Sequence, residues 1–303
     1  MLVFAASDKG GTGRSVTSAN LAYRRAIAGD NVCYLDFDFG SPTAAAVFDV
    51  PGALRGIDHG GLHSYLQGKI PEPVRIDVWA ETEHDVLRHR PTGSGDLTLL
   101  PGDLSGGEFG VTKDVLRRCI DLFLTLNSEY DLVVVDLSAG RSYAVDMALD
   151  ATSQMRKVRA RWLVYHRWTR QHVIAAAGLV FGQRGIVSGG VARGHDEEEL
   201  RGAIRFVRAA VPDPESPLWS QVPPAQSAWM RMCDQDLNDL AGDLDIGFTK
   251  VLGSVPLEPV LQWREQLITD EDVLASQIAN METWQALEEL AAKLTDDESW
   301  GQP

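Results

Sequence analysis

The chain has 303 residues, 44% of them hydrophobic, and a formal net charge of −15 at pH 7. This length suits one α/β domain with insertions, and the acidic balance disfavours broad nonspecific binding to nucleic acid. Three separated cysteines without a CxxC pair disfavour a disulfide framework or a cysteine metal site. We see no signal peptide and no integral membrane segment, and we expect a cytoplasmic protein.

Short apolar runs alternate with helical patterns along the chain. We predict strands at 2–7, 31–40, 97–102, 131–140, 161–169 and 250–258. We predict helices at 15–28, 111–127, 171–181 and 279–295. Strands that alternate with helices indicate an α/β fold with a doubly wound, mostly parallel sheet.

Three segments do not follow this alternation, although we treat 1–303 as a single domain. Residues 51–96 hold many Gly and Pro and form a long excursion. Residues 183–247 are predicted to be an inserted, mainly helical element within the domain. Residues 296–303 are predicted to be a flexible tail.

A glycine-rich stretch, KGGTGRS at 9–15, follows the first strand and precedes the first helix. Its glycines allow a tight turn whose N–H groups point inward, and the helix adds its N-terminal partial positive charge. The stretch therefore predicts a phosphate-binding loop, in which the hydroxyl of Ser15 is placed to bind Mg²⁺. The predicted cofactor-binding residues are Gly10, Gly11, Thr12, Gly13, Arg14, Ser15 and Val16.

Carboxylates end two of the predicted strands. Asp36 and Asp38 point the same way at the end of 31–40, where ligands bind in open α/β sheets. Asp136 ends the apolar run of 131–140, and a buried carboxylate there is costly unless a cation compensates it. Taken alone, Asp136 could be a strand-end cap; in this ordered set it indicates a Mg²⁺ held through water.

These motifs resemble the ParA/MinD family of deviant P-loop ATPases. The family loop reads K-G-G-x-G-K-[ST], close to KGGTGRS here. YLDFDFGSPT is similar to the family's switch I, YDLVVVDLSAG to its Walker B and switch II, and VLGSVPLEPVLQWREQ to its closing strand and helix. The resemblance covers 1–182 and 250–293 with gaps and leaves 183–247 unexplained.

The resemblance implies a mechanism and its residues. Two subunits would bind ATP face to face, with Lys9 reaching across to the partner's nucleotide. Ser15 would hold Mg²⁺ with Asp136 behind it through water, and Asp36 would support the same magnesium site. Asp38 would position the attacking water, and hydrolysis would dissolve the homodimer. The catalytic set is therefore Lys9, Arg14 and Asp38.

Arg14 stands where the family has a lysine. Its guanidinium keeps the charge and can grip phosphate bidentately, but it is bulkier and planar, so binding should survive better than hydrolysis. We therefore expect a slow ATPase that acts as an ATP-dependent dimerisation switch on a protein partner, with 183–247 as a candidate partner surface. The alternatives are a nucleotide-bound scaffold or adaptor without hydrolysis and, more weakly, a DNA-partitioning ATPase.

One dense basic run, at 155–172, offers a nucleic-acid alternative, because Trp162 and Trp168 are available for stacking. We favour a different interpretation, in which Trp162 and its neighbours are strand core and the arginines flank an anionic nucleotide. The part from His166 to Gln171 then lies at the ligand-binding end of the sheet, where a nucleotide or partner could contact it.

Overall fold

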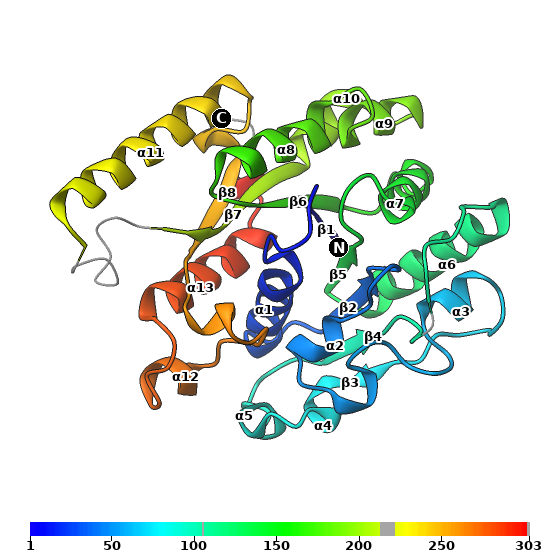
Figure 1. Cartoon of the computed structure of the whole chain (residues 1–303). Coiled ribbons are helices and arrows are strands. Elements are labelled where there is room, and N and C mark those ends of the chain that lie inside the picture. Colours follow the sequence, from blue (N-terminus) through cyan, green and yellow to red (C-terminus); the bar gives the residue numbers. More distant parts are fainter. Residues whose placement is uncertain (105, 213–221, 302–303) are drawn as a thin grey trace.

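The computed structural model describes residues 1–104, 106–212 and 222–301, and these form one eight-stranded sheet covered by helices on both faces (Figure 1). The strand order is β3-β4-β2-β5-β1-β6-β7-β8, and every neighbouring pair is parallel except β3 and β4. The strands are β1 (Leu2–Ala6), β2 (Val32–Phe37), β3 (Ile76–Asp77), β4 (Leu97–Leu100), β5 (Leu132–Leu137), β6 (Ala160–Arg167), β7 (Ile204–Val211) and β8 (Val251–Pro256). The predicted α/β fold class is confirmed.

Each face of the sheet has its own apolar core, because successive side chains of a strand point to opposite faces. In β1, Leu2, Phe4 and Ala6 belong to one core, and Val3 and Ala5 to the other. The first core is covered by α3 (Leu62–Leu66), α6 (Lys113–Glu129), α7 (Tyr143–Gln154), α8 (Arg170–Phe181), α9 (Ile186–Ala192), α10 (Glu197–Gly202) and α11 (Pro224–Asp243). The second is covered by α1 (Arg14–Ile27), α2 (Ala44–Val47), α4 (Val78–Glu81), α5 (Asp85–Arg88), α12 (Asp270–Leu274) and α13 (Met281–Thr295).

The register of the central strands gathers the predicted motifs at one edge of the sheet. β1 lies between β5 and β6, and Asp36 of β2 pairs with Asp136 of β5. Because these strands are parallel, their carboxyl ends meet at the edge where open α/β sheets bind ligands. The glycine loop that follows β1 lies at that edge.

The predicted helical element at 183–247 requires a correction. Its described residues hold α9, α10 and α11, but also β7, which lies inside the sheet between β6 and β8. Ile204 and Phe206 of β7 are buried in the first core, so this strand is part of the domain and not of an insertion. Residues 213–221 of the predicted element lie outside the described residues.

The tail at 296–303, predicted to be flexible, is described as far as residue 301 and packs against the fold there. Trp300 is only 8% exposed, and its ring lies 4.5 Å from the guanidinium carbon of Arg161 and 5.4 Å from that of Arg205. The Arg205 Nη2 also donates to the carbonyl oxygen of Trp300 at 2.8 Å. Two cation–π contacts and a hydrogen bond therefore fix this end of the chain.

One helical stretch in the described part of the chain, Arg170–Ala192, is long and apolar enough to cross a membrane, with a mean hydropathy of 1.3. Half of its most apolar window is buried inside the protein, and Gly182 and Gly185 separate α8 from α9. A core helix passes the same test of length and composition, so the stretch is weak evidence for a membrane span.

Candidate functional site

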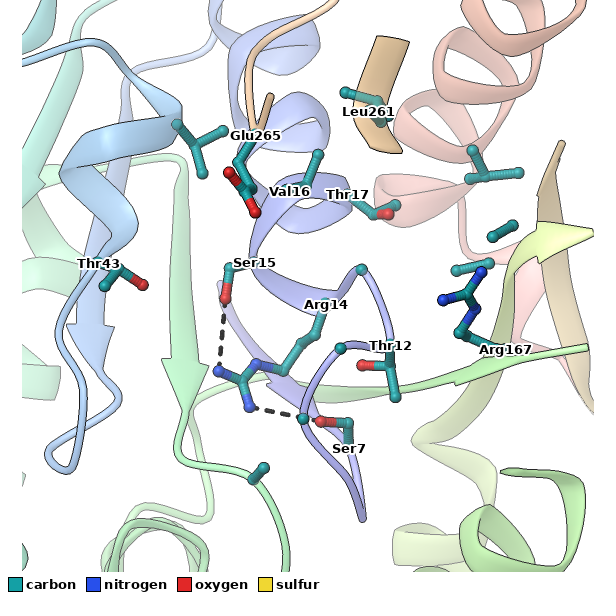
Figure 2. A pocket seen from close by; sticks show the side chains of 18 of the residues that line it. Ser7, Thr12, Arg14, Ser15, Val16, Thr17, Thr43, Arg167, Leu261 and Glu265 are labelled. Atoms are coloured by element: carbon teal, nitrogen blue, oxygen red, sulfur yellow. Dashed lines mark hydrogen bonds between the residues drawn. The ribbon is translucent and has the colours of Figure 1, made fainter. Parts of the chain in front are cut away.

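A pocket of about 520 Å³ opens at the carboxyl edge of the sheet, directly over the glycine loop. The loop and the start of α1 line one wall, from Ser7 and Gly10 to Thr17. Figure 2 shows Arg167 beyond Thr12, on the side of the loop away from Ser15. The lining also includes Ala209, Ala210, Val255, Pro256, Leu261, Gln262 and Glu265. This volume is within the range of small-molecule and cofactor sites.

The backbone of the glycine loop is shaped to receive an anion. Gly11 and Gly13 have φ of 71° and 78°, in the left-handed region that favours glycine. A Cβ built at Gly10 or Gly11 would meet no atom within 4 Å, so a ligand can approach the backbone closely there. α1 begins at Arg14 without a side-chain cap and without an acidic residue in its first turn. Its first N–H groups therefore remain available, together with the helix dipole, for a negatively charged ligand.

Arg14 lies at the centre of the predicted site, but on the carboxylates. It is buried, with 6% exposure, and its Nε donates to Asp136. Its Nη2 donates to Asp38 at 3.0 Å and to the hydroxyl of Ser15 at 3.4 Å. Its Nη1 donates to the hydroxyl of Ser7 at 3.4 Å, and Figure 2 shows the guanidinium between the two serines. One guanidinium therefore contacts three of the residues predicted for magnesium binding and hydrolysis.

The charges around Arg14 balance only in part. Burial acts to lower the pKa of Arg14, but the carboxylates of Asp136 and Asp38 outweigh it and raise that pKa above its ordinary value. Asp36 is fully enclosed, and burial, followed by repulsion from Asp136, raises its pKa to about 8. The carboxyl cluster is thus short of positive charge, although Arg14 is paired.

Asp36 also shapes the turn after β2. Its carboxylate accepts from the backbone N–H of Ala44 at 2.9 Å and from that of Asp38 at 3.3 Å. Asp36 and Asp136 do not line the pocket; they lie behind it, while Asp38, with 24% exposure, faces it. The buried carboxylate therefore holds the segment that presents Asp38.

Most of the predicted site residues line the pocket, Asp36 and Asp136 lie behind it, and Lys9 lies outside the lining. The pocket is lined by Gly10, Gly11, Thr12, Gly13, Arg14, Ser15, Val16 and Asp38. Lys9 lies on the same loop, outside the lining, and is partly exposed. Its ammonium forms no ion pair with any residue in the described ranges.

Several residues of the pocket were not predicted as site residues. Arg167 lies in the stretch from His166 to Gln171 that we expected at the ligand-binding end of the sheet, but it was not named as a site residue. It ends β6 and lines the pocket as its second cation, and its side chain forms no ion pair within the described residues. Ala210 has a φ of 50°, where the register between β7 and β8 shifts. Such bulges and positive φ values in non-glycine residues cluster at functional sites.

The donor set fits a magnesium ion. The side chains of Ser15, Asp38 and Asp136 offer only oxygen atoms, the ligands that Mg²⁺ prefers. Within the described residues, no group of three or more His, Cys, Asp or Glu side chains is arranged to enclose a metal alone. That suits Mg²⁺, which usually takes one or two protein ligands and completes its shell with phosphates and water.

The sheet, the glycine loop before α1 and the acidic ends of β2 and β5 define a P-loop nucleoside triphosphatase fold. More particularly, the chain has the ParA/MinD-like form of that fold. No family model matches the sequence, and no curated protein matches it. The resemblance to this family noted in the sequence is therefore supported by the structure, at the level of the fold.

Three solved structures illustrate the likeness. The MinC:MinD cell division protein complex of Aquifex aeolicus has a TM-score of 0.61 and 15% identity, covering 97% of this chain and 94% of that one. A putative plasmid partition protein of Borrelia burgdorferi, bound to AMPPNP, has a TM-score of 0.60 and 14% identity, and the match covers 96% of each chain. The septum site-determining protein MinD of Pyrococcus horikoshii, complexed with Mg-ADP, has a TM-score of 0.52 and 18% identity. That match covers 98% of this chain and 96% of the other.

Proposed function

We propose that this chain binds ATP with Mg²⁺ in the pocket over the glycine loop and acts as an ATP-dependent dimerisation switch for a protein partner. The observation that carries the proposal is the open backbone at Gly10 and Gly11, next to the uncapped start of α1. Nothing in the described fold fills that space or uses those N–H groups, so they suit phosphate oxygens. Structures of similar fold bound to AMPPNP and to Mg-ADP support the choice of ligand.

The chain's own residues would divide the work as follows. Ser15 would hold Mg²⁺, with Asp136 and Asp36 behind it. Bound there, Mg²⁺ would neutralise charge on the phosphate oxygens. Arg14 would turn from Asp136 and Asp38 toward the phosphates, which leaves Asp38 free to orient water in the pocket. Because this exchange disrupts a buried ion pair, we propose that turnover is slow.

Lys9 is the residue that we propose for the contact between subunits. It is partly exposed at the pocket's edge, and its ammonium has no carboxylate partner in the described part of the chain. A cation left unpaired there is suited to a phosphate presented by a second copy. ATP would then join two subunits, and hydrolysis would separate them.

A second candidate function is a nucleotide-locked scaffold that does not hydrolyse ATP. The observation that favours it is the set of hydrogen bonds from Arg14 to Asp38 and Ser15, which engages residues assigned to turnover. A DNA-partitioning role remains the weaker alternative. One structure of similar fold is titled a putative plasmid partition protein, but the net charge of −15 opposes binding to a phosphate backbone.

Two measurements on the purified chain test the proposal. Isothermal titration calorimetry should show ATP binding that is lost in EDTA and absent for adenosine, which lacks phosphates. Light scattering with AMPPNP should show a dimer that the Lys9→Ala variant cannot form, although that variant still binds nucleotide. Equal affinity for adenosine and ATP would refute the phosphate cradle, and a Lys9→Ala dimer would remove Lys9 from the interface.

A single-turnover assay with labelled ATP separates the two candidate functions. Slow conversion to ADP in wild type, unchanged or faster in Arg14→Lys, supports the switch. No conversion in either protein, with ATP binding intact, supports the scaffold. Loss of activity in Arg14→Lys would show that the guanidinium is a specialised catalytic group.

A further inference from the structure

A second cavity, of about 740 Å³, lies between the start of α8 and the long helix α11. We call it the α11 groove. Trp168, Thr169 and Arg170 line one side of it, and Pro212 also belongs to the lining. The other side is lined by residues of α11, from Gln226 to Asp243. Figure 1 shows α11 at the periphery of the fold, beside α8.

The apolar stripe of α11 is only half covered. Trp229, Cys233, Leu237 and Leu240 follow one another at spacings of a helical turn, so they share one side of the helix. Leu237 and Leu240 pack against the first core, but Trp229 is 60% exposed. Nearby Met232 is 56% exposed. A stripe that continues past the core into an open groove indicates a surface that another chain covers.

The wall of the groove opposite α11 is rigid. The Trp168 indole N–H donates to Asp234 at 2.7 Å, which ties that wall to α11. The guanidinium carbon of Arg208 lies 3.7 Å from the centre of the Trp168 ring. Trp168 is 4% exposed, so its position is fixed by these contacts and by burial. A preformed groove binds a partner at a lower entropic cost than a mobile surface.

The negative charge of the groove favours a basic occupant. Asp234, Asp236, Asp239 and Asp243 come from α11, and Arg170 is the basic residue among the described lining. Large apolar side chains fit the half-covered stripe, and lysines or arginines complement the aspartates. α11 has 20 residues, roughly 30 Å at 1.5 Å per residue, which accommodates several turns of a partner helix.

We infer that the α11 groove binds a basic amphipathic helix of a protein partner. A second copy of this chain is a poorer occupant, because its densest basic run, 155–172, forms β6 and the start of α8 and is not free to enter a groove. The groove also adjoins the nucleotide pocket, since Arg167 lines that pocket and the next three residues line the groove. The inference rests on the proposed function only in identifying this helix with the partner that the switch regulates.

Fluorescence anisotropy with a defined probe tests the inference. The probe is a labelled synthetic helix of about 18 residues, roughly 27 Å long, with leucines on one face and lysines on the other. Its twin carries glutamate in place of lysine. Wild type should bind the lysine probe and not its twin, because the groove is acidic. If wild type binds neither peptide, or both equally, the inference is wrong.

Matched variants separate the groove from the general acidity of the chain. Two variants should each lower the affinity for the lysine probe by about tenfold or more: Trp229→Ala, and the triple variant D236N, D239N and D243N. The triple variant E197Q, E198Q and E199Q on the distant helix α10 removes the same charge and should change the affinity by less than about twofold. Equal losses in the two triple variants would show nonspecific attraction and overturn the inference.

Two further results keep this test apart from that of the proposed function. ATP affinity, measured on the same groove variants, should equal that of wild type, so loss of ATP binding with intact probe binding would count against the nucleotide site alone. Sedimentation of wild type without nucleotide should show a monomer. A dimer that Trp229→Ala dissolves would identify a second copy as the occupant and refute the basic partner.

Discussion

Replacing Arg14 with methionine should destabilise the fold, independently of any effect on nucleotide. The variant leaves Asp136, which is 1% exposed, as a buried carboxylate without its partner. Removing one member of a buried ion pair costs about 3–5 kcal/mol. The second pair, with Asp38, adds less, because Asp38 is 24% exposed and partly solvated. We therefore expect the free energy of unfolding to fall by about 3 kcal/mol.

Urea unfolding followed by circular dichroism measures this change. Arg264→Met is the matched control, because Arg264 is 58% exposed and pairs with Asp49 on the surface, where such a pair is worth less than about 1 kcal/mol. Adding Asp136→Asn to Arg14→Met should recover much of the loss, because it removes the unpaired charge.

A fall of less than about 1 kcal/mol in Arg14→Met would refute this reasoning. It would mean that water or another group already compensates Asp136, and that the hydrogen bonds of Arg14 contribute little to the fold. A double variant no more stable than Arg14→Met would lead to the same conclusion.

Three other predictions concern separate parts of the molecule. Burial lowers the pKa of His166 to about 4 from 6.5, so the free energy of unfolding of wild type should fall as the pH drops from about 6.5 toward 4. In urea unfolding, His166→Leu should show a smaller difference in that free energy between pH 7 and pH 5 than wild type does. Trp300→Ala should lower the free energy of unfolding by about 3 kcal/mol, whereas Trp263→Ala, at a site 91% exposed, should have little effect. Arg167→Gln should weaken ATP binding in calorimetry by about tenfold, because Arg167 lines the pocket as a cation without an ion pair in the described residues. Arg170→Gln, outside that lining, should bind ATP within about twofold of wild type, and equal losses in the two variants would show that Arg167 does not contact the nucleotide.

Much of the sheet could be predicted from sequence, because buried parallel strands are continuous apolar runs. The six predicted strands correspond to β1, β2, β4, β5, β6 and β8. β7 was missed because arginines at 205 and 208 interrupt its apolar pattern. Those arginines are accommodated by distant parts of the fold: Arg205 donates to the carbonyl of Trp300, and Arg208 stacks on Trp168. No local pattern reveals such partners.

The site could be predicted only where its residues share one local motif. The glycine loop and Asp38 each directly follow an apolar strand, and both line the pocket at the carboxyl ends of β1 and β2. Arg167 belongs to the stretch that we expected at the ligand-binding end of the sheet, whereas the segment 255–265 reaches the same pocket from β8, and only the strand order shows that role. The pairing of Arg14 with Asp136 joins residues that are distant in sequence, and side-chain geometry alone decides it.

The central position of β1 also governs how the chain can fold during synthesis. Leu2 pairs with Val133 on one side and with Ala160 on the other, so β1 has no partner in the sheet until β5 and β6 have been made. A ribosome-bound chain that ends before β5 therefore carries its glycine loop on an unpaired apolar strand. Such long-range pairing slows folding and exposes the strand to aggregation or chaperone capture. Translation must pass the middle of the chain before the loop acquires its shape.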